Sequence, residues 1–223
     1  MEILRSAVKL LGQAATWEIV FLSFRISLLA TILSFLVSLP VTLFILNRLK
    51  KGKILISFFQ AFLFIPSVTL GLLLYLSLSR RGFLGFLGLL YTPKAMVLGQ
   101  AILIFPLITV FLLNGLKEIS GKVRDTLLTL GASSLQYNAL LLREAKFCLA
   151  SSFIVGLSRA IGETGLAMVV GGNIKGETRV ITTAIALDTM RGNFEIALAL
   201  GLILLTAALF LNLSFQIVEH RWR

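Results

Sequence analysis

Two opposite charges stand inside a long apolar run, in the segment GLSRAIGETGLAMVVGGNI at 156–174. Arg159 and Glu163 are four residues apart, a spacing that places two side chains on one helix face and lets them pair. A charge at the centre of a bilayer costs roughly 2.5–3.5 kcal/mol on insertion scales, so the two should pair. Two interpretations stay open: the pair lines or gates a solute pathway, or it only fixes the packing of helices.

The following segment, 171–201, is rich in glycine, threonine and charge. Five of its side chains could offer charge-assisted hydrogen bonds to a tetrahedral oxyanion: Lys175, Arg179, Thr182, Thr183 and Arg191. The same side chains could instead contact a soluble protein that delivers the solute, or could only face water. The residue types leave these three alternatives open.

The chain lacks the sequence motifs of an ATPase or a metalloenzyme. A phosphate-binding loop reads G-x-x-x-x-G-K followed by Ser or Thr, whereas the Gly-Lys pairs at 52–53 and 121–122 each precede an aliphatic residue. His220 is the only histidine, which excludes a metal site built from histidines. We therefore expect no catalytic residue, no metal and no cofactor on this chain.

The stretch RDTLLTLGASSLQYNALL, at 124–141, is too polar to cross a bilayer and too regularly apolar to be a slack loop. Read as a helix, it places five residues on one face at spacings of three and four: Leu128, Gly131, Leu135, Ala139 and Leu142. Such a helix could dock a soluble partner, or it could rest on the lipid surface. Periodicity alone favours neither.

The elements that hold these residues must be membrane helices. The chain has 223 residues, 57% hydrophobic and 14% charged, with a mean hydropathy of +0.96, whereas soluble domains carry about 25% charged residues. Five apolar runs each reach the roughly 20 residues that span the hydrocarbon core: 26–46, 54–79, 95–116, 147–174 and 196–218. We predict an all-α integral membrane protein with about five transmembrane helices, forming a single domain over 1–223.

The basic residues predict the orientation of these helices. The cluster NRLKKGK at 47–53 places the first connection in the cytoplasm, because short basic loops stay inside. The N-terminus and the loop 172–195 are then outside, while the segment 117–146 and the C-terminus are cytoplasmic. Residues 1–17 are expected to form an amphipathic helix at the outer surface. The net charge of +11 reflects topology and lipid contact or attraction of an anionic solute.

Proline interrupts the first three predicted spans, at Pro40, Pro66 and Pro106. Membrane bundles tolerate such residues as ordinary kinks, but broken helices also line the passages of transporters. Pro66 and Pro106 are therefore candidate pathway or gate positions. The segment 82–94, with its repeated glycines, predicts a short re-entrant or surface turn.

The stretch 124–141 resembles the cytoplasmic coupling motif of ABC-importer permeases, which reads Glu-Ala-Ala, three residues, Gly, and about nine residues later Ile-x-Leu-Pro. Asp125, Thr126 and Leu127 stand at the Glu-Ala-Ala positions, Gly131 at the glycine and Leu141 at the isoleucine. The pair at 143–144 is Arg-Glu in place of Leu-Pro, so this chain leaves the motif differently. The resemblance implies that these residues, together with Leu135, insert into an ATP-binding subunit.

With SRAIGE at 158–163 and TRVITTAIALDT at 178–189, essentially the whole chain resembles the permease subunits of tungstate importers, a branch of the molybdate and sulfate importer group. The resemblance implies a type I importer permease fold and a homodimer in the plasma or inner membrane. It also implies two ATP-binding subunits that carry ATP and Mg, and an external protein that delivers the oxyanion. A permease for molybdate or another oxyanion, and an ion-coupled secondary carrier, stay open as alternatives.

Overall fold

The computed structural model describes residues 14–48, 52–129 and 133–220, which form helices and turns with no strand among them. Three helices are long and apolar enough to cross a membrane by themselves: α2 (Ala14–Arg48), α5 (Pro93–Thr129) and α10 (Phe194–His220). Two more spans are each built from a bent pair of helices. The predicted all-α membrane architecture with about five spans is thereby confirmed.

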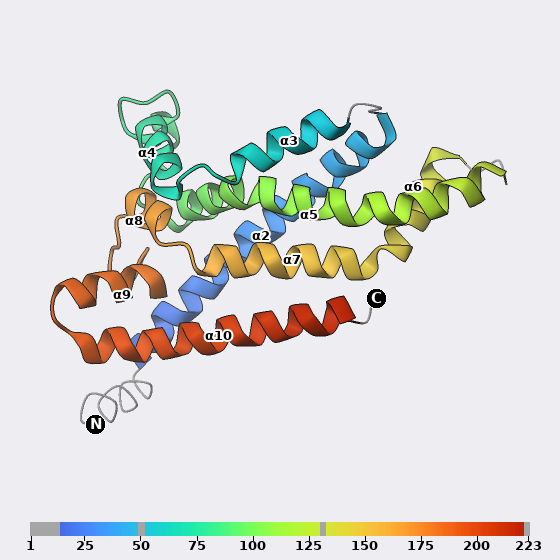
Figure 1. Cartoon of the computed structure of the whole chain (residues 1–223). Helices are drawn as coiled ribbons and strands as arrows, with labels where there is room; N and C mark the ends of the chain where they lie inside the picture. The colour runs from blue at the N-terminus through green and yellow to red at the C-terminus, as the bar shows by residue number, and fades with distance from the viewer. Residues whose placement is uncertain (1–13, 49–51, 130–132, 221–223) are drawn as a thin grey trace.

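The second and fourth spans are broken. α3 (Gly52–Phe62) meets α4 (Ser67–Leu78) at 89°, and α7 (Lys146–Ile161) meets α8 (Gly165–Gly171) at 62°. Hydropathy could not reveal these breaks, because the residues that form them are mostly apolar or glycine. Figure 1 shows α4 and α8 side by side at one end of the bundle, with α9 (Ile181–Met190) beneath them in this view.

The core lies where α2 crosses α5 and α7 (Figure 1). The inner face of α2 carries buried hydroxyl residues at spacings of three and four: Ser23, Ser27, Thr31, Ser34, Ser38 and Thr42. The hydrophobic effect does not drive helices together within lipid. Their association depends instead on close packing, which small side chains allow. A Cβ on Gly156 of α7 would lie 2.6 Å from Ile108 Cδ1 of α5, which shows how tightly these helices meet.

Of the three prolines in apolar runs, only Pro66 lies at a break. Pro40 and Pro106 lie inside α2 and α5, which continue through them. The carbonyl oxygen of Phe105, next to Pro106, accepts hydrogen bonds from the hydroxyls of Thr109 at 2.7 Å and Ser38 at 3.3 Å. The bond from Ser38 links α2 to α5 beside Pro106; the carbonyl that Pro106 leaves without an amide donor is that of Ile102, four residues back.

The two ends of the bundle differ. The start of α2, the turn segment 79–92 and α9 lie at one end, whereas α6 (Ser134–Glu144) and the end of α10 lie at the other (Figure 1). α2 begins at Ala14, so residues 14–17 of the expected amphipathic segment lie in α2, whose membrane-spanning part starts at Thr16; residues 1–13 lie outside the described chain, where the amphipathic helix stays a prediction. Within the segment 82–94, residues 82–92 form surface turns around a short 3-10 helix, η1 (Gly85–Leu87), and Pro93 and Lys94 begin α5.

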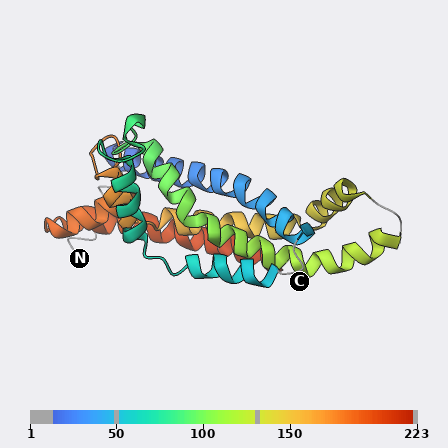
Figure 2. The same cartoon turned by 90° about the horizontal axis from the view of Figure 1, so that it is seen from above.

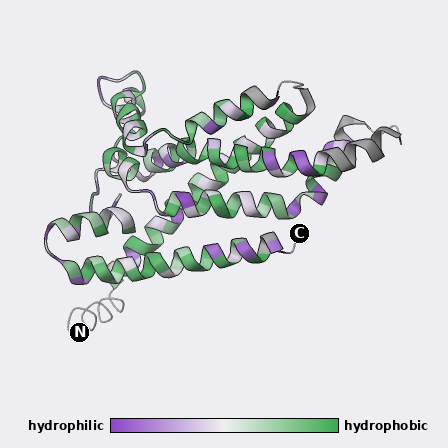
Figure 3. Cartoon of the chain, in the orientation of Figure 1, coloured by the Kyte–Doolittle hydropathy of each residue, from purple (hydrophilic) through white to green (hydrophobic). Residues whose placement is uncertain are grey.

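α5 is the longest helix, with 37 residues, and its last turns leave the bundle together with α6. Figure 2 shows this pair projecting beyond the ends of α3 and α10. Figure 3 shows hydrophobic residues along the bundle and hydrophilic residues where α5 leaves it. The hydrophilic residues at this point favour a position for the projecting pair outside the apolar part of the bundle.

The turn before α5 is hydrogen-bonded to the end of α8. The backbone N–H of Tyr91 donates to the carbonyl of Val170 at 3.0 Å. Gly172 ends α8 with a left-handed φ of 71°. A Cβ on Gly172 would stand only 2.6 Å from Cδ1 of the Tyr91 ring, so this glycine is required both by its backbone and by its neighbour.

We expect Gly172→Ala to lower the free energy of unfolding by about 2–5 kcal/mol, because left-handed alanine costs roughly 1–2 kcal/mol and overpacking typically about 1–3 kcal/mol. Gly192→Ala is the matched control: its φ is 78°, but a Cβ there meets nothing within 4 Å, so only the backbone cost remains. Thermal unfolding in detergent compares the two variants. Equal losses would show that the Tyr91 ring moves aside at no cost.

Candidate functional site

The breaks in the two bent spans lie against each other. A Cβ on Gly165, the first residue of α8, would stand 2.5 Å from Cγ2 of Val68 near the start of α4. Further along, a Cβ on Gly71 would lie 3.1 Å from the Cα of Leu166. α4 and α8 therefore approach as closely as glycine allows. Irregular backbone at bilayer depth must be buried in protein or line a water-filled cavity, so the paired breaks are the candidate site.

Pro66 sets the position of the first break. The amides of the three preceding residues, 63–65, each donate to the carbonyl three residues back, at 3.1–3.2 Å. Pro66 has no N–H and takes an extended ψ of 131°, which turns the chain before α4 begins at Ser67. The outer side of this break is uncovered, since Phe64 is 85% exposed in the single chain.

Glu163 holds the second break together. It lies between α7 and α8 and is only 2% exposed. Its Oε2 accepts a hydrogen bond from Arg159 Nη1 at 2.6 Å, and its Oε1 accepts one from the backbone N–H of Leu166 at 3.0 Å. Its carbonyl accepts a hydrogen bond from the Thr182 hydroxyl at 2.8 Å. One buried residue thus joins α7, α8 and α9.

The structure contains the ion pair that the spacing of Arg159 and Glu163 predicts, but the two residues are not on one helix. α7 ends at Ile161, so Glu163 lies in the break itself. The two side chains also differ in burial: the Arg159 side chain is 43% exposed and the Glu163 side chain 2%. The carboxylate is therefore enclosed by the fold, while part of the Arg159 side chain is exposed.

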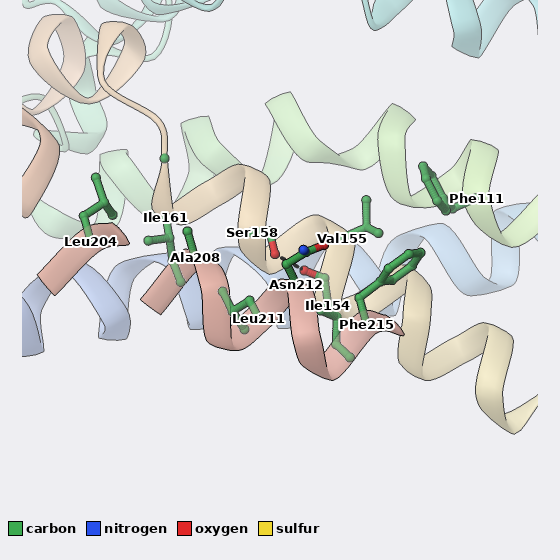
Figure 4. A pocket seen from close by; sticks show the side chains of 11 residues that line it. Phe111, Ile154, Val155, Ser158, Ile161, Leu204, Ala208, Leu211, Asn212 and Phe215 are labelled. Atoms are coloured by element: carbon green, nitrogen blue, oxygen red, sulfur yellow. Dashed lines mark hydrogen bonds between the residues drawn. The ribbon is translucent and has the colours of Figure 1, made fainter. Parts of the chain in front are cut away.

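A crevice of about 490 Å³ lies between α7, α10 and Phe111 of α5 (Figure 4). Ile161 and Leu204 line one end of it, and Ile154 and Phe215 line the other. Its walls are apolar except for Ser158, whose hydroxyl donates to the carbonyl of Ile154 at 2.8 Å, and Asn212 of α10.

Three of the five candidate external residues are engaged within the chain. The hydroxyl of Thr183, at 0% exposure, accepts from the N–H of Val180, and Thr182 is bonded to Glu163. Arg179 donates to Oδ1 and to the carbonyl of Asn173, at 3.2 and 3.3 Å. Lys175 and Arg191 are exposed. The expected loop 172–195 instead contains α9, of which Thr182 and Thr183 face inward while Thr189 is exposed.

The coupling residues expected from the resemblance fall on two helices. Asp125, Thr126 and Leu127 lie in the last turns of α5, and Leu135 lies in the first turn of α6; Gly131 lies outside the described residues. The expectation of one helix over 124–141 is therefore wrong.

A capping box starts the second of these helices. The hydroxyl of Ser133 accepts from the N–H of Gln136 at 3.4 Å, and Oε1 of Gln136 accepts from the N–H of Ser133 at 2.9 Å. The S-x-x-Q pattern is a known helix-start signal, and sequence reasoning overlooked it.

Leu141 does not face outward from this projection. It is fully buried and belongs to a cluster that includes Leu112, Leu116, Ala145 and Cys148. Ala145 alone separates α6 from α7. The buried side of α6 therefore packs against both α5 and α7. A displacement of α6 must also displace these two helices.

A comparison with known families now bears on these features. Residues 31–223 match the family described as the binding-protein-dependent transport system inner membrane component. The chain belongs to this family. The permease is accordingly a multi-pass protein of the inner or plasma membrane, consistent with its apolar spans.

Individual relatives agree with this assignment. The permease is 43% identical over 215 residues to the tungstate uptake system permease protein TupB of Peptoclostridium acidaminophilum, covering 93% of this chain and 92% of that protein. It is 36% identical to a probable anion ABC transporter permease protein of Haloferax volcanii, covering 87% of each. A bacterial ABC transporter involved in import of the polysaccharide alginate has the same fold, with a TM-score of 0.72 at 19% identity, covering 98% of this chain and 82% of that one.

Sequence reasoning missed what surrounds Glu163. The two partners outside the SRAIGE segment, the Leu166 amide and the Thr182 hydroxyl, lie on α8 and α9. A glycine after Glu163 at 165 hinted at a helix boundary, but glycine is common in membrane spans and also marks close packing. No pattern in the sequence indicated that Thr182 would reach a residue 19 positions away.

We expect Glu163→Ala to lower the free energy of unfolding by about 3 kcal/mol, because it removes one partner of a buried ion pair and uncaps α8. For Glu163→Gln the loss in the free energy of unfolding should be about 1 kcal/mol smaller, because the glutamine amide oxygen can still accept a hydrogen bond from the Leu166 N–H. Denaturation in detergent measures both variants. Identical losses would exclude any contribution from the hydrogen bond to Leu166.

Thr182→Val should cost about 1–2 kcal/mol, since it leaves the buried carbonyl of Glu163 without its hydroxyl donor. Thr189→Val is the control, because the Thr189 hydroxyl is exposed and bonds only within α9; its effect should stay within about 0.5 kcal/mol. If Thr182 instead contacts the solute, Thr182→Val will raise the half-saturating concentration for uptake and leave stability unchanged.

Proposed function

We propose that this permease forms the translocation pathway of an ATP-driven importer for an oxyanion, with tungstate as its substrate. The observation that carries the proposal is 43% identity to a tungstate uptake permease across nearly the full length of both chains. The similarity to a probable anion transporter permease supports the wider substrate class. Binding and hydrolysis of ATP, with Mg, belong to a partner protein in this proposal.

The proposed assembly contains two copies of this permease, two ATP-binding subunits and an external substrate-binding protein. The end of α5 and α6 dock on the ATP-binding subunit through Asp125, Thr126, Leu127, Gly131 and Leu135. Leu141, being buried, ties α6 to the bundle instead of touching the partner. The N-terminus is outside and the C-terminus is cytoplasmic, in keeping with the basic cluster at 47–53.

The proposed pathway runs past the paired breaks. Arg159 and Glu163 mark it on the fourth span and Pro66 on the second; buried Pro106 supports α5 behind them. Lys175 and Arg191 are placed to contact the delivering protein or the anion, while Arg179, Thr182 and Thr183 shape the surface that carries them. The bundle alternates between inward-open and outward-open states as ATP clamps the two partner subunits together.

Uptake into vesicles that hold the permease and its ATP-binding subunit, with loaded binding protein outside, tests the function. We expect tungstate accumulation that requires ATP inside the vesicle, and competition by molybdate, because both are divalent tetrahedral anions. The control contains a permease without ATP-binding subunit, which should accumulate nothing. Uphill uptake by the permease alone, driven by an ion gradient, would instead establish a secondary carrier.

Capture of the ATP-binding subunit tests the coupling segment. The double change Gly131→Arg with Leu135→Glu should reduce copurification at least tenfold, because it places bulk and charge in the docking surface. Met190→Glu is the control, since Met190 is 79% exposed at the other end of the bundle. Retained capture in the double variant, at the level of the control, would contradict the docking role.

A further inference from the structure

We propose that the exposed side of the Arg159 guanidinium binds the oxyanion while it crosses the middle of the membrane. The inference rests on the function proposed above and names one residue of the pathway that touches the substrate. It is carried by the depth of Arg159, by its unused hydrogen-bond donors, and by the uncovered helix face on which it lies.

The depth of Arg159 follows from the packing of α7 along α10. Ile161 shares one end of the crevice with Leu204, and Ser158 lies near Ala208 and Asn212 (Figure 4). These α10 residues are in the middle part of a helix that runs from Phe194 to His220. A rise of 1.5 Å per residue puts this level roughly 20 Å from either end of α10. The guanidinium is therefore far from both membrane surfaces.

A guanidinium at that depth cannot face lipid at low cost, so its exposed side must meet water or protein in the assembled transporter. Arg159 has five N–H donors, of which one ion-pair contact, Nη1 to Oε2 of Glu163, is made within the described chain. Planar guanidinium groups bind tetrahedral oxyanions through two parallel hydrogen bonds. The unused edge of Arg159 provides such donors.

The same face of α7 is uncovered around Arg159. Ser158, Arg159 and Gly162 are all exposed and occupy neighbouring positions on the helix surface, and the face ends at the break. Ser158 and Gly162 also line the crevice beside α10. An imported ion would pass the paired breaks first and would reach the arginine on this face immediately after them.

Glu163 limits how strongly Arg159 can bind the anion. Its buried carboxylate pairs with Arg159 and holds it in place, so the pair as a whole carries no net charge. An anion is thus attracted by oriented donors and not by a full net charge. A site that conducts must bind well enough to be entered and weakly enough to be left.

The test uses the complete importer in vesicles, with loaded binding protein outside, and measures tungstate uptake and ATP hydrolysis together. Arg159→Gln should reduce uptake at least tenfold, while ATP hydrolysis stimulated by the binding protein stays within twofold. Arg159→Lys should retain an intermediate rate, because it keeps the charge but loses the paired donors. Arg81→Gln, which removes an exposed arginine from the turn after α4, should take up tungstate normally.

The double variant Arg159→Gln with Glu163→Gln separates binding from packing, because two glutamines can pair with each other and leave no buried charge. If Arg159 binds the anion, the double variant should transport as poorly as Arg159→Gln alone. Recovery of uptake in the double variant, unchanged uptake in Arg159→Gln, or a parallel loss of uptake and ATP hydrolysis would each overturn the inference. A wild-type complex that takes up no oxyanion would overturn the proposed function and the inference with it.

Discussion

A polypeptide inside a bilayer has no water to pair with its backbone, and this constraint governs the fourth span. When α7 ends at Ile161, the first amides of α8 lose their partners. The Glu163 carboxylate accepts from one of them, at Leu166. A carboxylate with 2% exposure needs a counter-charge, which Arg159 supplies, and the Glu163 carbonyl needs a donor, which Thr182 supplies. The break, the ion pair and the docking of α9 are thus consequences of one requirement.

The second span meets the same requirement by other means. Residues 63–65 pair with carbonyls three positions back, and Pro66 has no donor to satisfy. Glycines at 71 and 165 then allow α4 and α8 to come together. The backbone of each break is satisfied within its own part of the chain, and α4 and α8 are in contact. A movement of one bent span must therefore displace the other.

α5 connects these breaks to the projecting end of the molecule. It packs on α3, α4 and α8 near its start and on α6 and α7 further along. Leu141 of α6 is buried with Leu112 and Leu116 of α5 and with Cys148 of α7. A force applied to α6 therefore reaches two long helices through close-packed side chains, and such interiors transmit displacement with little compression. This is the physical basis on which a partner that binds ATP could act on a site at bilayer depth.

The sequence by itself determined the class of the protein and most of its elements. Apolar runs of membrane-spanning length fix the helices, and the spacing of Arg159 and Glu163 required a pair, because these are local properties that each segment carries alone. Family motifs then indicated the importer permease, which the comparisons confirm.

Only the tertiary structure decided how proline acts, which charge is buried and which threonines face inward. Pro106 lies within a continuous helix, where Ser38 of α2 donates to the carbonyl of the neighbouring Phe105, while Pro66 lies at a break. Arg159 is half-exposed and Glu163 is buried, because α8 binds the carboxylate of Glu163 and α9 binds its backbone carbonyl. Each of these outcomes depends on a partner from a distant segment, so no local pattern could contain it.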